Sequence, residues 1–309
     1  MQEWTSDALW NKAKVFGERA FTAERNGDLF PLFASLSLEM LGKAVLANVH
    51  PVLIADPREG KDLLYAFGYP TTENPKSIAA KTVFNRLVVV VPEFTADDER
   101  ACLLMADRRN AELHTGEFAF REFPNGKWLP DFYRVTKVLV EHLGFELEDY
   151  LGRQEAKAAR QIIQNVEAKL KKEVNDRISK AKRSLEPLRG EELERRKADN
   201  EPPSDHVYSL QGLIAIARAC PACGSKGRLF VNAIGSTPAR LHDGEIMVQR
   251  IYAPTKFECK VCDLSLSGTG ELSITDLADQ IAIDVAVDPA EMFDLQPDVY
   301  VPEDDYGND

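Results

Sequence analysis

Residues 30–47 read FPLFASLSLEMLGKAVLA, and this stretch is apolar on nearly every side of a helix. A helix that is apolar all round is typically buried, because a surface helix keeps one polar face. The stretch ends shortly before His50 and Pro51, which favour a turn. We therefore expect a buried helix over residues 30–47 within an all-α domain.

The sequence on either side of this stretch is also typical of helices. Apolar residues at helical spacing predict helices over residues 4–25, 57–68 and 132–143. Residues 77–91 fit either a strand or a helix, and we predict a helix because the neighbouring segments are helical. Thr95 and the acids after it predict a helix start that leads to His114. Residues 117–130 should hold a turn at 124–126 between two short extended pieces.

The chain divides into four predicted regions. Residues 1–150 form the helical bundle, and residues 151–200 form an amphipathic connector helix whose apolar positions recur about every 3.67 residues, near an eleven-residue repeat. Residues 206–275 form a small β-rich zinc ribbon, and residues 276–309 form an acidic tail. In that tail Ile281, Ile283, Val285 and Val287 alternate like an edge strand. The predicted fold class is thus multidomain, with the bundle, the long helix and the ribbon in that order.

Two Cys-x-x-Cys pairs predict a structural zinc site. Cys220 and Cys223 form the first pair, and Cys259 and Cys262 form the second. Four thiolates complete a tetrahedral zinc site and leave no position for water. Two disulfides, which the cytosol disfavours, or a redox pair are the alternatives. Cys102 is expected to be a packed thiol on a helix.

The charge distribution separates the tail from the rest of the protein. The 309-residue chain has a net charge of −12, yet residues 271–309 contain twelve acidic and no basic residues. The remainder has 38 acidic and 38 basic residues, so the acidic balance does not argue against nucleic-acid binding. The longest uninterrupted apolar run, residues 87–91, is far too short to span a membrane, and no signal peptide is apparent. We expect a cytoplasmic protein without a membrane partner.

The end of the predicted helix before Thr115 carries Arg109, Asn110 and His114. A guanidinium offers a fork of donors that suits a phosphate, and an imidazole exchanges protons near neutral pH. The two together could cleave RNA without a metal. The spacing alone also fits a surface arginine and a half-buried histidine.

With this motif, the helix pattern of residues 1–150 resembles the HEPN superfamily, small helical bundles that dimerise and often act as metal-independent endoribonucleases. The resemblance implies a homodimer in which Arg109 holds the scissile phosphate, His114 transfers protons, and Asn110 orients one of them. Arg108 lies within the looser spacing of the family and could replace Arg109. Glu39 either forms an i,i+4 pair with Lys43 or is an acidic residue near the site.

Two functions therefore remain open. The first is an endoribonuclease that cleaves cellular RNA, uses no catalytic cofactor, and works as a toxin or an anti-phage defence effector. The second is a non-catalytic dimeric adaptor whose ribbon or tail binds nucleic acid or a protein partner. A zinc enzyme would need an open metal position, which four cysteines do not leave. The tail is either a solubilising end or a restraint that docks on a basic surface. A set of basic residues forms either a solvated helix face or a track for RNA, namely Lys169, Lys171, Lys172, Lys180, Lys182 and Arg183.

Overall fold

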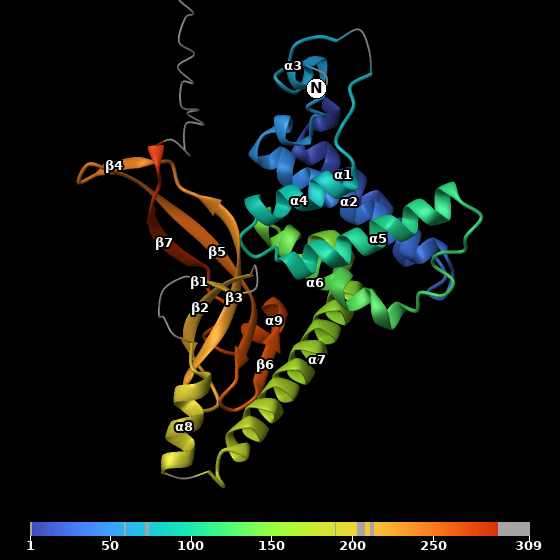
Figure 1. Ribbon diagram of the computed structural model, residues 1–309. Coiled ribbons are helices and arrows are strands. Elements are labelled where there is room, and N and C mark those ends of the chain that lie inside the picture. Colours follow the sequence, from blue (N-terminus) through green and yellow to red (C-terminus); the bar gives the residue numbers. More distant parts are fainter. Residues whose placement is uncertain are drawn as a thin grey trace, which may run out of the picture. The chain divides into compact units, whose positions relative to one another are not determined.

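The structure is a computed structural model that describes residues 2–58, 60–71, 74–188, 190–202, 208–210 and 213–289 (Figure 1). These residues form two compact units. The helical unit contains the described residues up to Lys180 together with Gly268–Ile274, and the β unit contains the remaining described residues. The predicted order of a helical region, a long helix and a β-region with four cysteines is confirmed.

Helices occupy most of the first half of the chain, as the sequence predicts. Within residues 77–91, whose valines also suited a strand, a helix spans Ala80–Val90, because Val83, Phe84 and Leu87 lie on one buried face. Short 3-10 turns lie at η1 (Gln2–Trp4), η2 (Pro51–Ile54) and η3 (Asn125–Lys127). The α-helices are α1 (Ser6–Thr22), α2 (Leu29–Val49), α3 (Gly60–Ala66), α4 (Ala80–Val90), α5 (Ala96–His114), α6 (Leu129–His142) and α7 (Leu147–Ser184).

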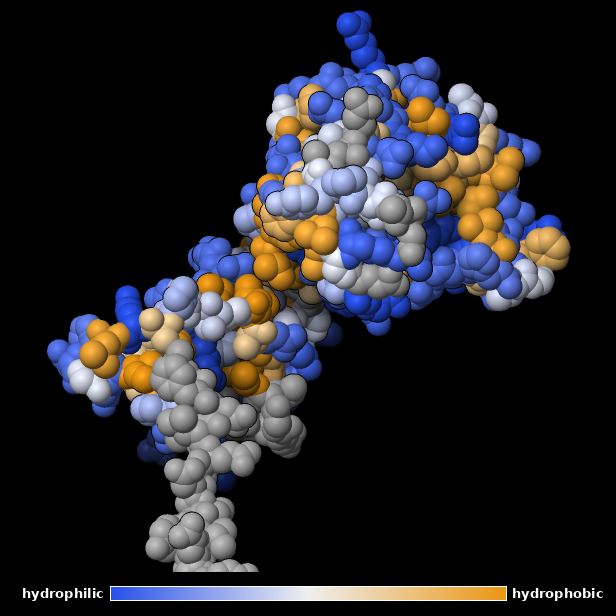
Figure 2. Space-filling model, turned by 90° about the horizontal axis from the view of Figure 1, so that it is seen from above, coloured by the Kyte–Doolittle hydropathy of each residue, from blue (hydrophilic) through white to orange (hydrophobic). Residues whose placement is uncertain are grey.

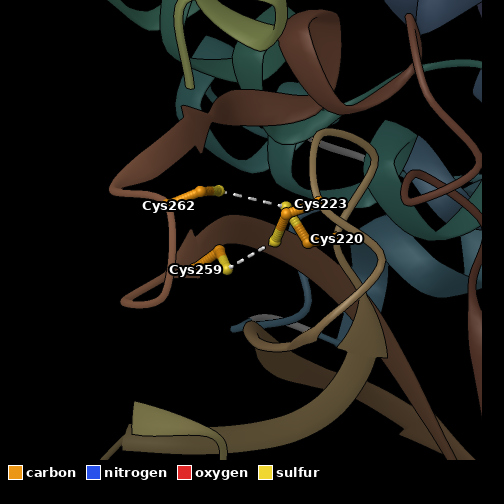
Figure 3. Close-up of side chains that lie close together, drawn as sticks. All are labelled: Cys220, Cys223, Cys259 and Cys262. Carbon is orange, nitrogen blue, oxygen red and sulfur yellow. Dashed lines mark hydrogen bonds between the residues drawn. The ribbon is translucent and has the colours of Figure 1, made fainter. Parts of the chain in front are cut away.

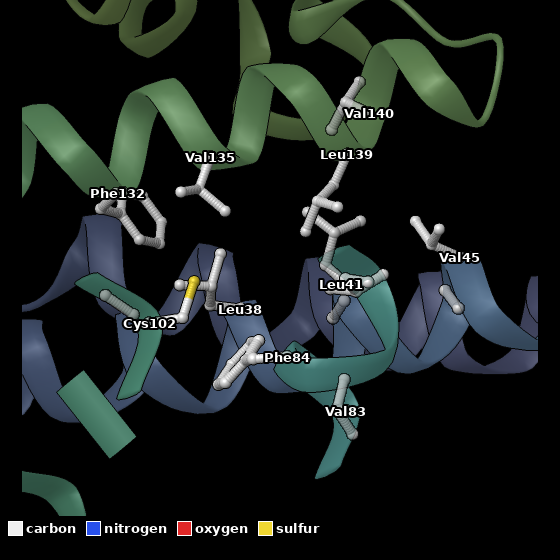
Figure 4. Close-up of a cluster of buried hydrophobic side chains, with 14 of the residues drawn as sticks. Leu38, Leu41, Val45, Val83, Phe84, Cys102, Phe132, Val135, Leu139 and Val140 are labelled. Carbon is white, nitrogen blue, oxygen red and sulfur yellow. The ribbon is translucent and has the colours of Figure 1, made fainter. Parts of the chain in front are cut away.

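Helix α2 is the centre of the helical unit, and its predicted burial is confirmed. Leu38, Leu41 and Val45 of α2 lie against side chains of α4, α5 and α6 in one continuous core (Figure 4). By length and hydropathy alone α2 would also suit a membrane span, with a mean hydropathy of 1.5 over its most apolar window. In the structure 72% of that window is buried, which is the environment of a core helix.

Helix α5 begins with the predicted cap and positions the candidate motif at its end. The Thr95 hydroxyl accepts the Asp98 amide at 3.3 Å, and the Asp98 carboxylate accepts the Thr95 amide at 2.8 Å, so the two residues form a capping box. The two extended pieces expected within residues 117–130 are wrong. Turns replace them, because the amides of Arg121 and Phe123 donate to carbonyls three residues earlier rather than to a neighbouring strand.

The connector predicted as one helix over residues 151–200 is also corrected. Helix α7 ends at Ser184, and a separate helix, α8 (Glu191–Asn200), follows it. Pro187 disfavours helical backbone at the residue before it, and Gly190 has a φ of 57°, so the turn between them separates the helices. Gly152, with a φ of 74°, also interrupts α7 near its start.

The β unit is an antiparallel half-barrel arranged around its longest strand, β5. This strand pairs with β3 along one edge and with β6 and β7 along the other, while β4 and β5 form a hairpin. In the β3–β5 register, residues 228–232 pair with residues 253–258 and residues 233–236 pair with residues 250–252, with irregularities between Phe230 and Val231 and between Ala233 and Gly235. The strands are β1 (Tyr208–Leu210), β2 (Leu213–Ala219), β3 (Lys226–Ser236), β4 (Arg240–His242), β5 (Glu245–Cys259), β6 (Leu264–Ser267) and β7 (Ile281–Ala286).

Two segments after residue 267 differ from the predicted boundaries. Residues 281–286, assigned to the acidic tail, form β7 and pair with β5, so the sheet extends beyond residue 275. The edge-strand alternation of Ile281, Ile283 and Val285 explains this, because every second residue is half-buried. Helix α9 (Gly268–Leu272), assigned to the ribbon, belongs to the helical unit, where the Thr269 amide donates to Asp97 at 3.0 Å. The rest of the acidic tail, from residue 290, lies outside the described residues.

Candidate functional site

The first cysteine pair lies in a tight turn between β2 and β3. The Gly224 amide donates to the Cys220 carbonyl at 2.9 Å, and Gly224 has a φ of 74°, which glycine adopts without strain. The Ala222 amide points at the Cys220 sulfur at 3.4 Å. This turn therefore directs the sulfurs of Cys220 and Cys223 to the same side, and the Ala222 amide can donate a hydrogen bond to a Cys220 thiolate.

The second pair lies in the turn that joins β5 to β6. Cys259 is the last residue of β5, and it pairs in register with Leu264, the first residue of β6. Asp263 closes the turn with a φ of 59°, a conformation that aspartate tolerates better than most residues. Because β3 and β5 are neighbours in the sheet, their pairing brings this turn beside the first pair.

The four sulfurs have the geometry of a closed zinc site. Their ligand atoms all lie within 4.8 Å of one another, with Cys220 and Cys262 at 3.5 Å and Cys223 and Cys259 at 3.6 Å (Figure 3). A tetrahedral site with Zn–S bonds of about 2.3 Å places its sulfurs about 3.8 Å apart, whereas a disulfide needs about 2.05 Å. Hydrogen bonds from Cys220 and Cys262 lower the pKa of the Cys259 thiol, and the same hydrogen bonding raises the pKa of Cys220 and Cys262, so Cys259 is the first of these three to ionise. The donor set fits zinc and leaves no open ligand position.

Neighbouring side chains hold the two turns in place. The Phe257 ring is fully buried and lies over Gly227, where an added Cβ would come within 2.3 Å of the ring. Arg196 of α8 pairs with Asp263 at 2.8 Å. The Glu201 carboxylate at the end of α8 accepts the Lys226 amide at 3.1 Å. Helix α8 is therefore tied to both cysteine turns, a role that its charged sequence did not indicate.

The candidate catalytic arginine lies in a buried ion-pair cluster between α2 and α5. The Arg109 guanidinium pairs with Glu39, whose other oxygen contacts the Lys43 ammonium at 2.8 Å. Lys43 also donates to the Ser77 hydroxyl at 3.2 Å. Glu39 therefore forms the i,i+4 pair with Lys43 and also lies beside Arg109. We call Glu39, Lys43 and Arg109 the buried ion triad.

The neighbouring charges of Lys43 and Arg109 determine whether Glu39 is ionised. Burial opposes the ionisation of Glu39, but the charge of Lys43 and hydrogen bonds from Lys43 and Arg109 outweigh it and lower the Glu39 pKa. Glu39 is therefore a carboxylate near neutral pH, and it serves two cations. Among the described residues, no second carboxylate forms an ion pair with Lys43 or Arg109.

Asn110 connects this triad to the surface of α5. Its side-chain oxygen accepts hydrogen bonds from Arg109 Nη2 at 3.0 Å and from Nε at 3.3 Å. Asn110 itself is exposed, and His114 is exposed one turn further along the helix. Residues four apart on a helix have Cβ atoms about 5–6 Å apart, so Asn110 and His114 share one surface face.

The structure does not bring Arg109 and His114 together within one chain. Five residues on an α-helix correspond to a rotation of about 140° after one full turn, and Arg109 faces the interior while His114 faces solvent. Among the described residues, the His114 side chain takes part in none of the hydrogen bonds or ion pairs. A phosphate held by one chain would reach both groups only if Arg109 moved or if a second chain supplied one of them.

The remaining candidate residues, Arg108 and Cys102, contact other parts of the helical unit. Arg108 donates to the Ala119 carbonyl at 2.6 Å and lies 4.1 Å from the Phe123 ring centroid, so it holds the segment after α5. Cys102 is buried, and burial raises its pKa, as expected for a packed thiol. The contact between Lys43 and Ser77 joins residues 34 positions apart, and no sequence signal predicts it.

No protein-family model, curated protein or solved structure matches the chain.

Proposed function

We propose that the protein is a metal-independent endoribonuclease that cleaves cellular RNA, as a toxin or an anti-phage defence effector. The observation that carries the proposal is the face of α5 on which Asn110 and His114 are exposed while Arg109 reaches Asn110 from beneath. The imidazole of His114 on this face and the guanidinium of Arg109 beneath it belong to one short segment of α5, and they are the pair of groups that the HEPN resemblance implies. It needs no metal at the reacting atoms.

The reaction follows from the groups available. His114 removes the proton of a 2′-hydroxyl or returns one to the leaving 5′-oxygen, and each positioned acid or base contributes on the order of 10²–10⁴ in rate. The 2′-oxygen forms a bond to phosphorus as the bond to the 5′-oxygen breaks. The products are a 2′,3′-cyclic phosphate and a 5′-hydroxyl.

Arg109 is the group proposed to hold the phosphate. A guanidinium has five N–H donors. Three of them are directed at Glu39 and Asn110, which leaves two for phosphate oxygens. A cation at the reacting phosphate stabilises the charge that develops in the transition state. Arg109 can therefore contribute to catalysis without losing its structural partners.

A homodimer is part of the proposal, because Arg109 and His114 diverge within one chain. Apolar side chains near the end of α5 support it, since Leu113 and Phe118 are 53% and 58% exposed. Apolar patches occur among polar regions on the face presented in Figure 2. Such side chains are typical of surfaces that a partner covers. Association through this end of α5 would bring a second Arg109 and His114 to the same place.

The four cysteines have a separate role in this proposal. Cys220, Cys223, Cys259 and Cys262 would hold a zinc ion, which supplies folding free energy to a small β unit rather than chemistry. The reaction would therefore continue when Mg²⁺ and other free divalent cations are removed.

The test is RNA cleavage by the purified full chain in EDTA. Wild-type protein should cleave, and His114→Ala and Arg109→Ala should lower the rate by at least about a hundredfold while both variants remain dimers. His142→Ala is a matched control, because His142 also occupies the last turn of a helix. Cleavage that is equally fast in His114→Ala and His142→Ala would refute the assignment.

A non-catalytic adaptor is the second candidate, and the buried ion triad favours it. An arginine that lies buried beside its carboxylate has a complete structural role without any substrate. In that case the α5 face would serve dimerisation, and the β unit or the acidic tail would bind nucleic acid or a protein. Expression in cells separates the two functions. Growth arrest that His114→Ala relieves supports the nuclease, and growth unaffected by either protein supports the adaptor.

A further inference from the structure

A cavity in the helical unit is lined by Lys43 of the buried ion triad and by residues of η1, α1, α2 and η2. It has a volume of about 360 Å³, within the range of small-molecule sites. Its walls are largely apolar, with Trp4, Leu9, Met40 and Ile54. The polar groups that line it are Glu3, Lys12, Lys43 and Ser77.

Lys43 contributes a positive charge and hydrogen-bond donors to the lining of this cavity. Its side chain is only 8% exposed, and its ammonium contacts Glu39 at 2.8 Å and the Ser77 hydroxyl at 3.2 Å. An ammonium has three donors, so one remains after these two contacts. A buried lysine that lines an apolar cavity is an uncommon arrangement, because burial penalises its charge.

The charge count of the buried ion triad indicates what the cavity takes. Lys43 and Arg109 are two cations, and Glu39 is the one carboxylate that pairs with them among the described residues. The triad therefore carries one uncompensated positive charge at side chains that are each about one-tenth exposed. An anion beside Lys43 would compensate this charge in surroundings where water screens it poorly.

We propose that this cavity binds a small organic anion, a carboxylate or a phosphate monoester that carries one ring or a short apolar chain. The anionic group contacts the Lys43 ammonium and the Ser77 hydroxyl. The apolar part lies against Trp4, Met40 and Ile54. Lys12 and Glu3, which also line the cavity, carry opposite charges, so Lys43 is the cation that decides the preference for an anion. This site is separate from the Asn110–His114 face, and it does not depend on RNA cleavage.

The experiment is a ligand-detected NMR titration of the full chain with benzoate and phenyl phosphate, with benzyl alcohol and benzylamine as neutral and cationic controls. A ligand of this size is expected to bind with a dissociation constant of about a millimolar, and the tighter of the two anions identifies the preferred group. Lys43→Met should weaken the binding of that anion by about tenfold or more.

Ser77→Ala should weaken binding by about fivefold, because it removes one hydrogen bond and leaves every ion pair of the triad in place. This variant keeps the test meaningful even if Lys43→Met folds poorly. Lys81→Met is the matched control, since Lys81 is exposed on α4 and does not line the cavity, and it should bind like the wild type.

Three results would overturn the proposal. They are failure of both anions to bind at about 20 mM, far above the expected constant, equally tight binding of benzyl alcohol, and anion binding that is unchanged in both Lys43→Met and Ser77→Ala. The anion-binding test is independent of the nuclease proposal, because binding is measured without RNA and a variant that no longer cleaves RNA can still bind the anion.

Discussion

Replacing Glu39, the negative member of the buried ion triad, should lower the free energy of unfolding far more than replacing Lys43, one of its two positive members. In Glu39→Gln, Lys43 and Arg109 remain as two buried cations facing a neutral amide. Breaking a buried ion pair by removing one partner costs about 3–5 kcal/mol. In Lys43→Met, the Glu39–Arg109 pair remains and the cluster becomes neutral. We expect Glu39→Gln to lower the free energy of unfolding by about 3 kcal/mol and Lys43→Met by less than about 1 kcal/mol.

Urea unfolding followed by tryptophan fluorescence measures this asymmetry in the helical unit alone. The three tryptophans, Trp4, Trp10 and Trp128, all lie in the helical unit and are buried there. With a slope of about 2 kcal/mol per molar urea, the loss in Glu39→Gln shifts the unfolding midpoint by about 1.5 M. Equal shifts in the two variants, or a larger shift in Lys43→Met, would show that the charge count of the triad is wrong.

The pH dependence gives an independent check on Glu39. Its pKa in the folded protein is lowered, because the charge of Lys43 and hydrogen bonds from Lys43 and Arg109 outweigh the effect of burial. A lowered folded pKa means that the stabilisation is fully present above the unfolded pKa of about 4.3 and is lost as the pH falls through the folded value. The difference between wild type and Glu39→Gln should therefore be largest near neutral pH and shrink below about pH 4. A difference that is constant from pH 7 to pH 3 would contradict the role of the charge.

Three further predictions concern the core, the metal and the tail. Gly42→Ala should lower the free energy of unfolding of the helical unit by about 1–3 kcal/mol in urea titration, because the added Cβ would meet the Val83 side chain at 2.8 Å; an unchanged midpoint would contradict the close packing of α2 on α4. Metal analysis should find one zinc per wild-type chain and none in Cys220→Ser/Cys259→Ser, with loss of strand signal in circular dichroism and unchanged tryptophan emission; full zinc content in the double variant would refute the ligand set. Truncation after residue 289, which keeps β7, removes seven acidic residues and should raise RNA affinity at low salt more than at high salt. A truncated chain that binds RNA no better than the full chain would exclude a restraint by the tail.

The helical architecture was predictable because its signals are local. The apolar stretch at residues 30–47 predicts a helix with no polar face, and Thr95 with Asp98 marks a helix start within four residues. The breaks in the connector were less predictable. Pro187 and Gly190 interrupt a composition that otherwise suits one continuous helix, and the apolar stripe gives no warning of this.

The candidate sites were predictable only in part, for the same physical reason. Two cysteines with two residues between them define a turn locally, so the ligand set follows from spacing once the strands between the pairs form a sheet. The contacts of Arg109 with Glu39 and of Lys43 with Ser77 depend on how distant helices pack. Periodicity places Arg109 on the same face of α5 as Cys102, Met105 and Ala106, and the five-residue spacing turns His114 about 140° away from it, but neither identifies Glu39 as the partner of Arg109.

The proposed nuclease depends on a site that two chains complete, and a mixing experiment tests this most directly. Arg109→Ala and His114→Ala, each inactive alone, are unfolded, mixed in equal amounts and refolded together, and RNA cleavage is then measured in EDTA. In mixed dimers one chain keeps its arginine and the other its histidine. Since random pairing makes about half of the dimers mixed, with one of two sites complete in each, about a quarter of wild-type activity should return. A mixture that contains mixed dimers and remains as inactive as either variant alone would contradict a site shared between chains.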